Sequence, residues 1–284
     1  MDKIIIIDKP LHLSSFDVVA KMRKVFNTKR VGHAGTLDPL ASGVLVVMLN
    51  KATKISNYLV MDNKQYIASF QLGKSTTTQD LEGDIVQEKT YLNDITLDKL
   101  KSVLASFEGI QMQTPSIYSA IKVNGKKLYE YARNNEEVVI PQREIDIKKI
   151  ELLDFVDDII TIKVDCSSGT YIRSLCFDIA NALGYPGVVT FLRRTVSGPF
   201  SIEQANNLED VLEGRYHLCD IKDGLVDYDN LCIEDNQIIT DIKNGKPLKV
   251  EMAKDFIVSD KEGNVLALFN ASINGLAKMK RGLW

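Results

Sequence analysis

The sequence predicts an α+β protein with one large N-terminal domain and one small C-terminal β-domain. At 284 residues, the chain exceeds the roughly 100 to 200 residues that one domain usually holds. Predicted strands and helices are interspersed without the regular strand-helix-strand order of a Rossmann fold. Between Gly214 and Asn230 the hydrophobic periodicity fades, and only short β-like runs follow.

The elements of the first half follow from local patterns. Apolar runs predict strands at residues 4–7, 44–49 and 66–72. Ser14 and Ser15 offer an N-cap for a helix whose apolar side is Val18, Val19, Met22, Val25 and Phe26. The small and polar residues of 30–42 and 75–84 predict two loops.

Similar signals continue through the second half. Thr96 precedes a helical pattern that Gly109 closes, and Gly184 ends another that follows Thr170. Residues 159–165 alternate as a strand does. Near the C-terminus, residues 238–239, 256–258 and 265–269 predict short strands between turns at Asn244-Gly245 and Glu262-Gly263-Asn264.

Composition gives a class of protein and excludes several kinds of site. With 45% hydrophobic and 26% charged residues, the chain has the composition of a soluble globular protein. The apolar run 4–7 is too short for a signal peptide or a membrane span, so we expect a cytoplasmic protein. Four cysteines without C-x-x-C spacing predict reduced thiols in the core. Three histidines without ligand spacing predict no metal site.

The net charge of -3 argues mildly against a nucleic-acid partner, because phosphate binding usually leaves a basic footprint. Local groups of cations could nevertheless bind phosphates, or they could be ordinary solvated faces. These groups are Lys21, Arg23, Lys24, Lys29 and Arg30; Lys122, Lys126, Lys127 and Arg133; Arg193 and Arg194; and Lys278, Lys280 and Arg281.

The most informative stretch is 32–43, where glycines and a proline impose a tight backbone around Asp38. Asp before Pro is also a common turn initiator. Residues 32–45, GHAGTLDPLASGVL, match the nucleophile motif of the TruB family of pseudouridine synthases almost throughout, and the chain resembles that family. The match continues in the family's order in Asp8-Lys9-Pro10, Tyr66, Leu72-Gly73, TPSIYSAIK at 114–122, GKKLYEYAR at 125–133, CSSGTYIRSL at 166–175 and Leu192-Arg193-Arg194.

The resemblance implies a fold and an activity. It implies a pseudouridine synthase domain over residues 1–222, with a mixed, largely antiparallel sheet flanked by helices, and a PUA-like RNA-binding domain over 228–284. The implied activity is the isomerisation of uridine 55 in the T loop of tRNA. The isomerisation needs no redox agent, metal or nucleotide, so we expect no cofactor. The expected partner is the T arm of tRNA, bound by a monomer that requires no protein partner.

The resemblance also assigns roles to individual residues. Spacing alone leaves other interpretations open. Asp38 is the implied nucleophile, Arg173 its cationic partner and Tyr66 the tyrosine that stacks on the target base. By spacing alone, Arg173 is an exposed helix residue and Tyr66 a packing residue. By the resemblance, His33 fills the gap left by the extruded base, whereas by itself it would belong to a turn. Tyr171 and Leu192 line the uracil pocket by the resemblance and would otherwise be core residues. Lys9 is either a phosphate contact or a structural neighbour of Asp38.

One departure and two rival functions remain. After Gly73 the family commonly has Thr-Asp-Thr, whereas this chain has Thr76-Thr77-Thr78 with Asp80 further along. Gly73-Lys74-Ser75 after a strand resembles the end of an ATPase P-loop, but Ala68 stands where the first loop glycine belongs. A catalytically silent RNA-binding protein or tRNA-folding chaperone is the other alternative, and it would not need the nucleophile.

Overall fold

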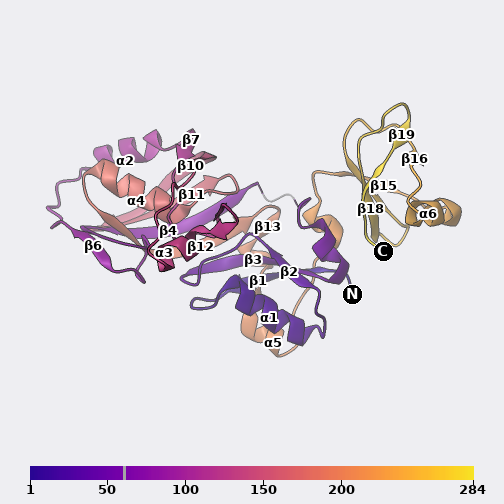
Figure 1. The fold of residues 1–284 in the computed structure, drawn as a ribbon, viewed down its shortest axis with the longest axis horizontal. Helices are drawn as coiled ribbons and strands as arrows, with labels where there is room; N and C mark the ends of the chain where they lie inside the picture. Colours follow the sequence, from indigo (N-terminus) through magenta and orange to yellow (C-terminus); the bar gives the residue numbers. More distant parts are fainter. Residues whose placement is uncertain (60–61) are drawn as a thin grey trace. The chain divides into compact units, whose positions relative to one another are not determined.

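The computed structural model describes residues 1–59 and 62–284, which fold into two compact units (Figure 1). One unit joins Met1–Met61 to Ser197–Trp284, and the other is Asp62–Val196. Among the described residues, no helix has the length and apolar character needed to cross a membrane.

The first unit contains a sheet built on β3 (Ala41–Leu49), in which every residue is buried. Antiparallel to it lie β1 (Ile4–Lys9) and β2 (Val31–Ala34), and the short β14 (Asn206–Asn207) is parallel to β1. The prediction of a loop over 30–42 is therefore wrong for Val31–Ala34, which form β2. Val31 and Ala34 are buried there and pair with β3, a long-range contact that composition does not reveal.

Helix α1 (Ser15–Val25) begins where the sequence predicts. The Ser14 side chain accepts from the backbone of Asp17, and the Asp17 carboxylate accepts from the backbone of Ser14. This capping box satisfies two amide groups that a helix start leaves without partners. Val18, Val19 and Met22 are buried, while Phe16 on another side of the helix is exposed. Helix α5 (Leu208–Leu212) packs against α1.

The C-terminal part of this unit has a sheet of its own, visible in yellow in Figure 1. Its strand order is β15 (Asp229–Cys232), β17 (Phe256–Ser259), β18 (Val265–Phe269), β20 (Met279–Gly282). Phe256 and Phe269 stack at 5.6 Å between ring centroids in a core that Ile242 and Ala277 share. Beside this sheet, β16 (Leu248–Lys249) pairs with β19 (Leu276–Ala277).

Two predictions for this region are wrong. Residues 238–239 belong to helix α6 (Asn236–Lys243), because the Asp235 carboxylate accepts from the amides of Gln237 and Ile238 and so starts a helix. Cys232 is exposed on β15, although Cys166 and Cys176 are buried as expected.

The C-terminal sheet also packs against the N-terminal part of the same unit. Ile257, Leu268 and Leu283 share a hydrophobic core with Ile4 and Val44. Residues 228–284 thus contribute to two cores, one of their own and one shared with the first sheet. The connecting short elements are η1 (Asn50–Ile55), β13 (Phe200–Ser201), η2 (Ile202–Gln204) and η3 (Ile221–Gly224).

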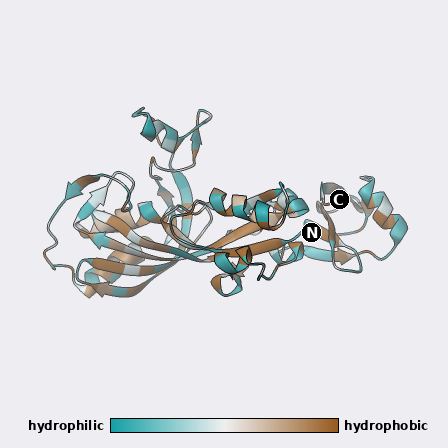
Figure 2. Ribbon diagram, turned by 90° about the horizontal axis from the view of Figure 1, so that it is seen from below, coloured by the Kyte–Doolittle hydropathy of each residue, from teal (hydrophilic) through white to brown (hydrophobic). Residues whose placement is uncertain are grey.

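The second unit has a sheet with the order β12 (Gly187–Ser197), β4 (Lys64–Leu72), β11 (Ile159–Cys166), β10 (Arg143–Val156), β7 (Gly109–Gln113). The pairings β4–β11, β11–β10 and β10–β7 are antiparallel. Alternate residues of β4 and β11 are buried. Figure 2 shows strands that carry both hydrophobic and hydrophilic stretches. The α+β class with a mixed, largely antiparallel sheet is confirmed.

Helices α2 (Leu97–Ser106) and α4 (Ile172–Leu183) lie side by side on this sheet (Figure 1). Thr96 caps α2, and Gly184 ends α4 with a φ of 93°, a left-handed conformation that glycine adopts without a steric penalty. Outside the sheet are β5 (Lys74–Thr76) with β6 (Ile85–Glu88), and β8 (Lys122–Val123) with β9 (Lys126–Lys127) and α3 (Leu128–Arg133).

The contact between α4 and the start of β12 generates a first prediction. A Cβ at Gly187 would lie 2.3 Å from the Cβ of Ala180, so Gly187→Ala overpacks the junction. We expect the free energy of unfolding, measured by urea denaturation, to fall by about 1–3 kcal/mol. Adding Ala180→Gly should restore part of that loss, although glycine weakens α4. A double variant no more stable than Gly187→Ala would show that the steric contact is not the cause.

Candidate active site

Asp38 lies in the turn between β2 and β3, and the backbone of this turn is held from both sides. The Ser15 hydroxyl accepts from the Leu37 amide at 2.9 Å and donates to the Leu37 carbonyl at 3.1 Å. The Ala41 amide donates to the Asp38 carbonyl at 3.0 Å. Asp38 is half-buried, and its neighbour Leu37 is buried. These bonds fix the backbone from which the carboxylate projects.

Lys9 supports the same turn from the end of β1. Its side chain is fully buried, and its ammonium donates to the carbonyls of Pro10, Leu13 and Pro39 at 2.9, 2.6 and 3.4 Å. The His12 amide donates to the Pro39 carbonyl as well, at 2.8 Å. Of the two roles considered for Lys9, this geometry supports that of a structural neighbour.

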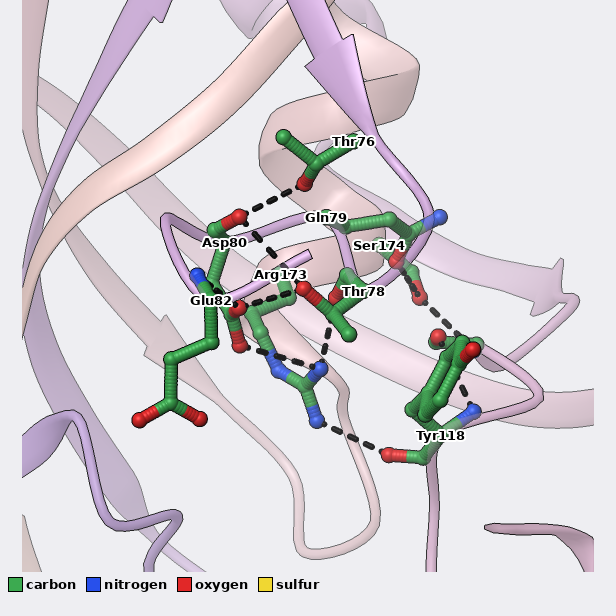
Figure 3. A network of polar contacts seen from close by, with 9 residues as sticks. Thr76, Thr78, Gln79, Asp80, Glu82, Tyr118, Arg173 and Ser174 are labelled. Carbon is green, nitrogen blue, oxygen red and sulfur yellow. Dashed lines mark hydrogen bonds and ion pairs between the residues drawn. The ribbon is translucent and has the colours of Figure 1, made fainter. Parts of the chain in front are cut away.

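Arg173 lies in the first turn of α4 and is 7% exposed, so the interpretation as an exposed helix arginine is wrong. Figure 3 shows its guanidinium held by two loops. Nη1 donates to the Thr78 carbonyl at 2.7 Å and lies 3.3 Å from the Asp80 carboxylate. Nη2 donates to the Tyr118 carbonyl at 3.1 Å. The charge is thereby paired and its plane is fixed.

Asp80 is the residue that sequence reasoning left without a role. Its carboxylate accepts from the Thr78 hydroxyl at 2.5 Å and from the Glu82 amide at 3.1 Å, and its carbonyl accepts from the Thr76 hydroxyl at 2.6 Å (Figure 3). Gly83 makes room for this turn, since a Cβ there would lie 2.6 Å from the Thr78 hydroxyl. The threonines and Gly83 that lie near Asp80 in the sequence were the signal that could have indicated its structural role.

A further chain of bonds links the two loops through Ser174, the neighbour of Arg173. The Ser174 hydroxyl donates to the Gln79 side chain at 3.0 Å and accepts from the Ser116 amide at 3.1 Å. The Ser116 hydroxyl in turn accepts from the Tyr118 amide at 3.2 Å. The loops that bind Arg173 are therefore tied to each other as well as to the guanidinium.

The other predicted residues are distributed over both units. Tyr66 is buried on β4 opposite Val164, and Leu192 is buried on β12. Tyr171 is the N-cap residue of α4; its amide donates to the Gln113 side chain at 2.9 Å and its carbonyl accepts from it at 3.0 Å. His33 lies half-buried on β2 in the unit that also carries Asp38 and Lys9. Tyr66, Tyr171, Arg173 and Leu192 belong to the other unit.

Within residues 1–59 and 62–284, no three histidine, cysteine, aspartate or glutamate side chains are grouped as metal ligands would be. The chemistry that these residues offer is that of a fixed carboxylate, a buried guanidinium and aromatic side chains.

Comparison with known proteins identifies the family. A model described as TruB family pseudouridylate synthase (N terminal domain) matches residues 23–172, and one described as tRNA pseudouridylate synthase B C-terminal domain matches 173–224. The chain belongs to the TruB family. The tRNA pseudouridine synthase B of Limosilactobacillus reuteri is 40% identical over 95% of this chain and 94% of its own. That of Staphylococcus saprophyticus is 41% identical over 94% of each chain.

Solved structures agree with this TruB membership. A chain of the crystal structure of a Cbf5-Nop10-Gar1 complex superposes with a TM-score of 0.74 and 25% identity, over 99% of this chain and 85% of that one. The resemblance inferred from the sequence motifs is confirmed.

The buried pair of Asp80 and Arg173 generates a second prediction. Asp80→Asn removes this carboxylate from the buried guanidinium and leaves the charge less well compensated. We expect the free energy of unfolding to fall by about 1–3 kcal/mol, as measured by urea denaturation. Glu82→Gln is the matched control, because the Glu82 side chain in the same loop is exposed. Equal losses in the two variants would contradict a specific role for the buried pair.

A third prediction concerns pH and Asp178, on α4. Burial raises the pKa of this carboxyl from 3.8 to about 6. Because the folded state binds this proton more tightly than the unfolded state, the carboxyl destabilises the fold increasingly as pH rises from about 4 to about 6. Asp178→Asn should therefore raise the free energy of unfolding at pH 7.5 and have less effect at pH 4.5. An equal gain in the free energy of unfolding at both pH values would refute this role of Asp178. So would an equal gain from Glu137→Gln, a control at an exposed carboxyl.

Proposed function

We propose that this TruB family protein isomerises uridine 55 in the T loop of tRNA to pseudouridine, with Asp38 as the nucleophile. The observation that carries the proposal is the matched motif around Asp38, in a chain about 40% identical over nearly its whole length to proteins named tRNA pseudouridine synthase B. The backbone bonds to Leu37 and Ala41 support it, because a nucleophile must be sterically fixed.

The reaction detaches uracil from C1′ of its ribose through nitrogen and reattaches it through carbon. All atoms of the substrate remain in the product, so the carboxylate, a proton acceptor and a pocket for the base suffice. We assign to Arg173 the role of acting on the ionised Asp38 carboxylate, as the resemblance implies. Asp80, Thr78 and Tyr118 would then serve as positioning residues, because they hold the guanidinium.

Tyr66, Tyr171 and Leu192 are the residues to which we assign the uracil, with Tyr66 stacking on the base, and His33 would replace the base within the RNA stack. Extruding a base from folded RNA costs a few kcal/mol, and stacking on an aromatic side chain returns about 1–3 kcal/mol. The buried environment of Tyr66 and Leu192 supports this assignment, because an apolar wall keeps water from the base.

We further propose that residues 228–284 form a PUA-like module that contacts the tRNA outside the T loop. Its separate core around Phe256 and Phe269 supports an independent binding surface. Folded RNA is recognised largely by shape and backbone, so affinity should fall as salt rises. A monomer in the cytoplasm, working without a protein partner, is the form in which we expect this activity.

The decisive prediction is that Asp38→Asn abolishes isomerisation and keeps RNA binding. We expect pseudouridine formation in an unmodified tRNA transcript, mapped by mass spectrometry without added cofactor, to fall by at least about a thousandfold. Asp227→Asn, an exposed carboxylate in the same unit, should leave the rate unchanged. Wild-type protein that binds the transcript without modifying it would instead support the silent RNA-binding or chaperone alternative.

A further inference from the structure

An exposed aromatic ring follows Ser15, the residue that bonds to the turn carrying Asp38. Phe16, in the first turn of α1, is 66% exposed, whereas the adjacent apolar residues Val18 and Val19 are buried. The Arg23 guanidinium lies over the Phe16 ring, 5.9 Å from its centroid. An arginine stacked on an exposed ring presents a flat apolar surface with a positive edge.

Among the described residues, Arg23 contacts the Phe16 ring but has no anionic partner. In the part of the chain that the structure describes, no carboxylate forms an ion pair with Arg23, and its buried Nε has no hydrogen-bond partner. Residues 14–31 hold five lysines and arginines and a single carboxylate, Asp17, which bonds to Ser14. The excess of positive charge in this segment favours an anionic ligand that also offers a flat face to the ring.

The start of α1 is bonded to the turn that carries Asp38. Ser15, the neighbour of Phe16, bonds in both directions to Leu37, which immediately precedes Asp38. Lys9 joins the carbonyl of Leu13 to that of Pro39. An RNA segment that reaches Asp38 therefore comes close to the start of α1.

We propose that Phe16 and Arg23 bind one nucleotide of the RNA strand that flanks the target uridine. Phe16 stacks on its unpaired base, and Arg23 binds the adjacent phosphate. Base stacking on aromatic side chains and arginine contacts to phosphate are the two features of single-stranded RNA recognition. The proposal rests on the proposed function, and it adds a second base contact on α1.

The first test is spectroscopic. Trp284 is the one tryptophan of the chain, so Phe16→Trp in a Trp284→Phe background places a single reporter on α1. Adding unmodified tRNA transcript should quench its fluorescence, because a stacked base quenches an indole. A reporter at Leu153, exposed on β10 and remote from α1 in sequence, is the matched control and should not be quenched. Unchanged fluorescence of the Phe16→Trp reporter at saturating transcript would overturn the proposal.

The second test separates stacking from packing through steady-state kinetics. Phe16→Leu should raise KM for the transcript about tenfold with kcat within twofold, whereas Phe16→Tyr should resemble wild type. Arg23→Gln should raise KM and reduce the slope of log KM against log salt by about one, which exposed Lys101→Gln should not do. Equal KM values for wild type, Phe16→Leu and Arg23→Gln, or a loss confined to kcat, would overturn the proposal.

Failure of the proposed function and failure of the nucleotide contact would give different results. If wild-type protein forms no pseudouridine, the proposed function is wrong, and fluorescence still reports on RNA binding at α1. If wild-type protein is active but neither Phe16 nor Arg23 affects KM or fluorescence, only the nucleotide contact is wrong. Because Phe16 is exposed, its variants should have the same midpoint of urea denaturation as the wild type. An unchanged midpoint would exclude misfolding as the cause of a change in KM.

Discussion

The buried guanidinium of Arg173 imposes a physical constraint on the second unit. A charge removed from water must be paired and hydrogen-bonded, or the fold loses several kcal/mol. Its acceptors come from segments far apart in the sequence, Thr78 and Asp80 in one loop and Tyr118 in another. Because α4 presents the guanidinium where both loops meet, folding the unit also assembles this part of the candidate site.

Lys9 applies the same principle to the first unit, with carbonyl groups in place of a carboxylate. Its buried ammonium draws the carbonyls of Leu13 and Pro39 together, and so joins the segment before α1 to the turn that carries Asp38. A neutral apolar residue of similar length would fill the space and remove the donor that these carbonyls share, although the Pro39 carbonyl would keep the His12 amide. The two buried cations therefore serve geometry first, and each does so through groups that sequence spacing does not connect.

The difference between local and long-range signals explains what could be predicted. Ser14 and Gly184 act on the residues beside them, so both ends of helical segments were found from sequence. Strand β2 was missed because its burial depends on pairing with β3, and β10 because most of its residues are at least partly exposed. The motif match proposed Asp38 and Arg173 as site residues, but the sequence after Gly73 could not show that Asp80 contacts Arg173.

The net charge of -3 also bears on how such a protein could recognise RNA. At physiological ionic strength charges are screened beyond about 8 Å, so the distribution of cations near the site matters more than their sum. Residues 14–31 hold five cations and one carboxylate, so this segment is locally basic in a chain that is acidic overall. A weak overall field attracts RNA poorly from a distance. Affinity must then depend on short-range contacts, and the proposed stacking of a base on Phe16 would be one of them.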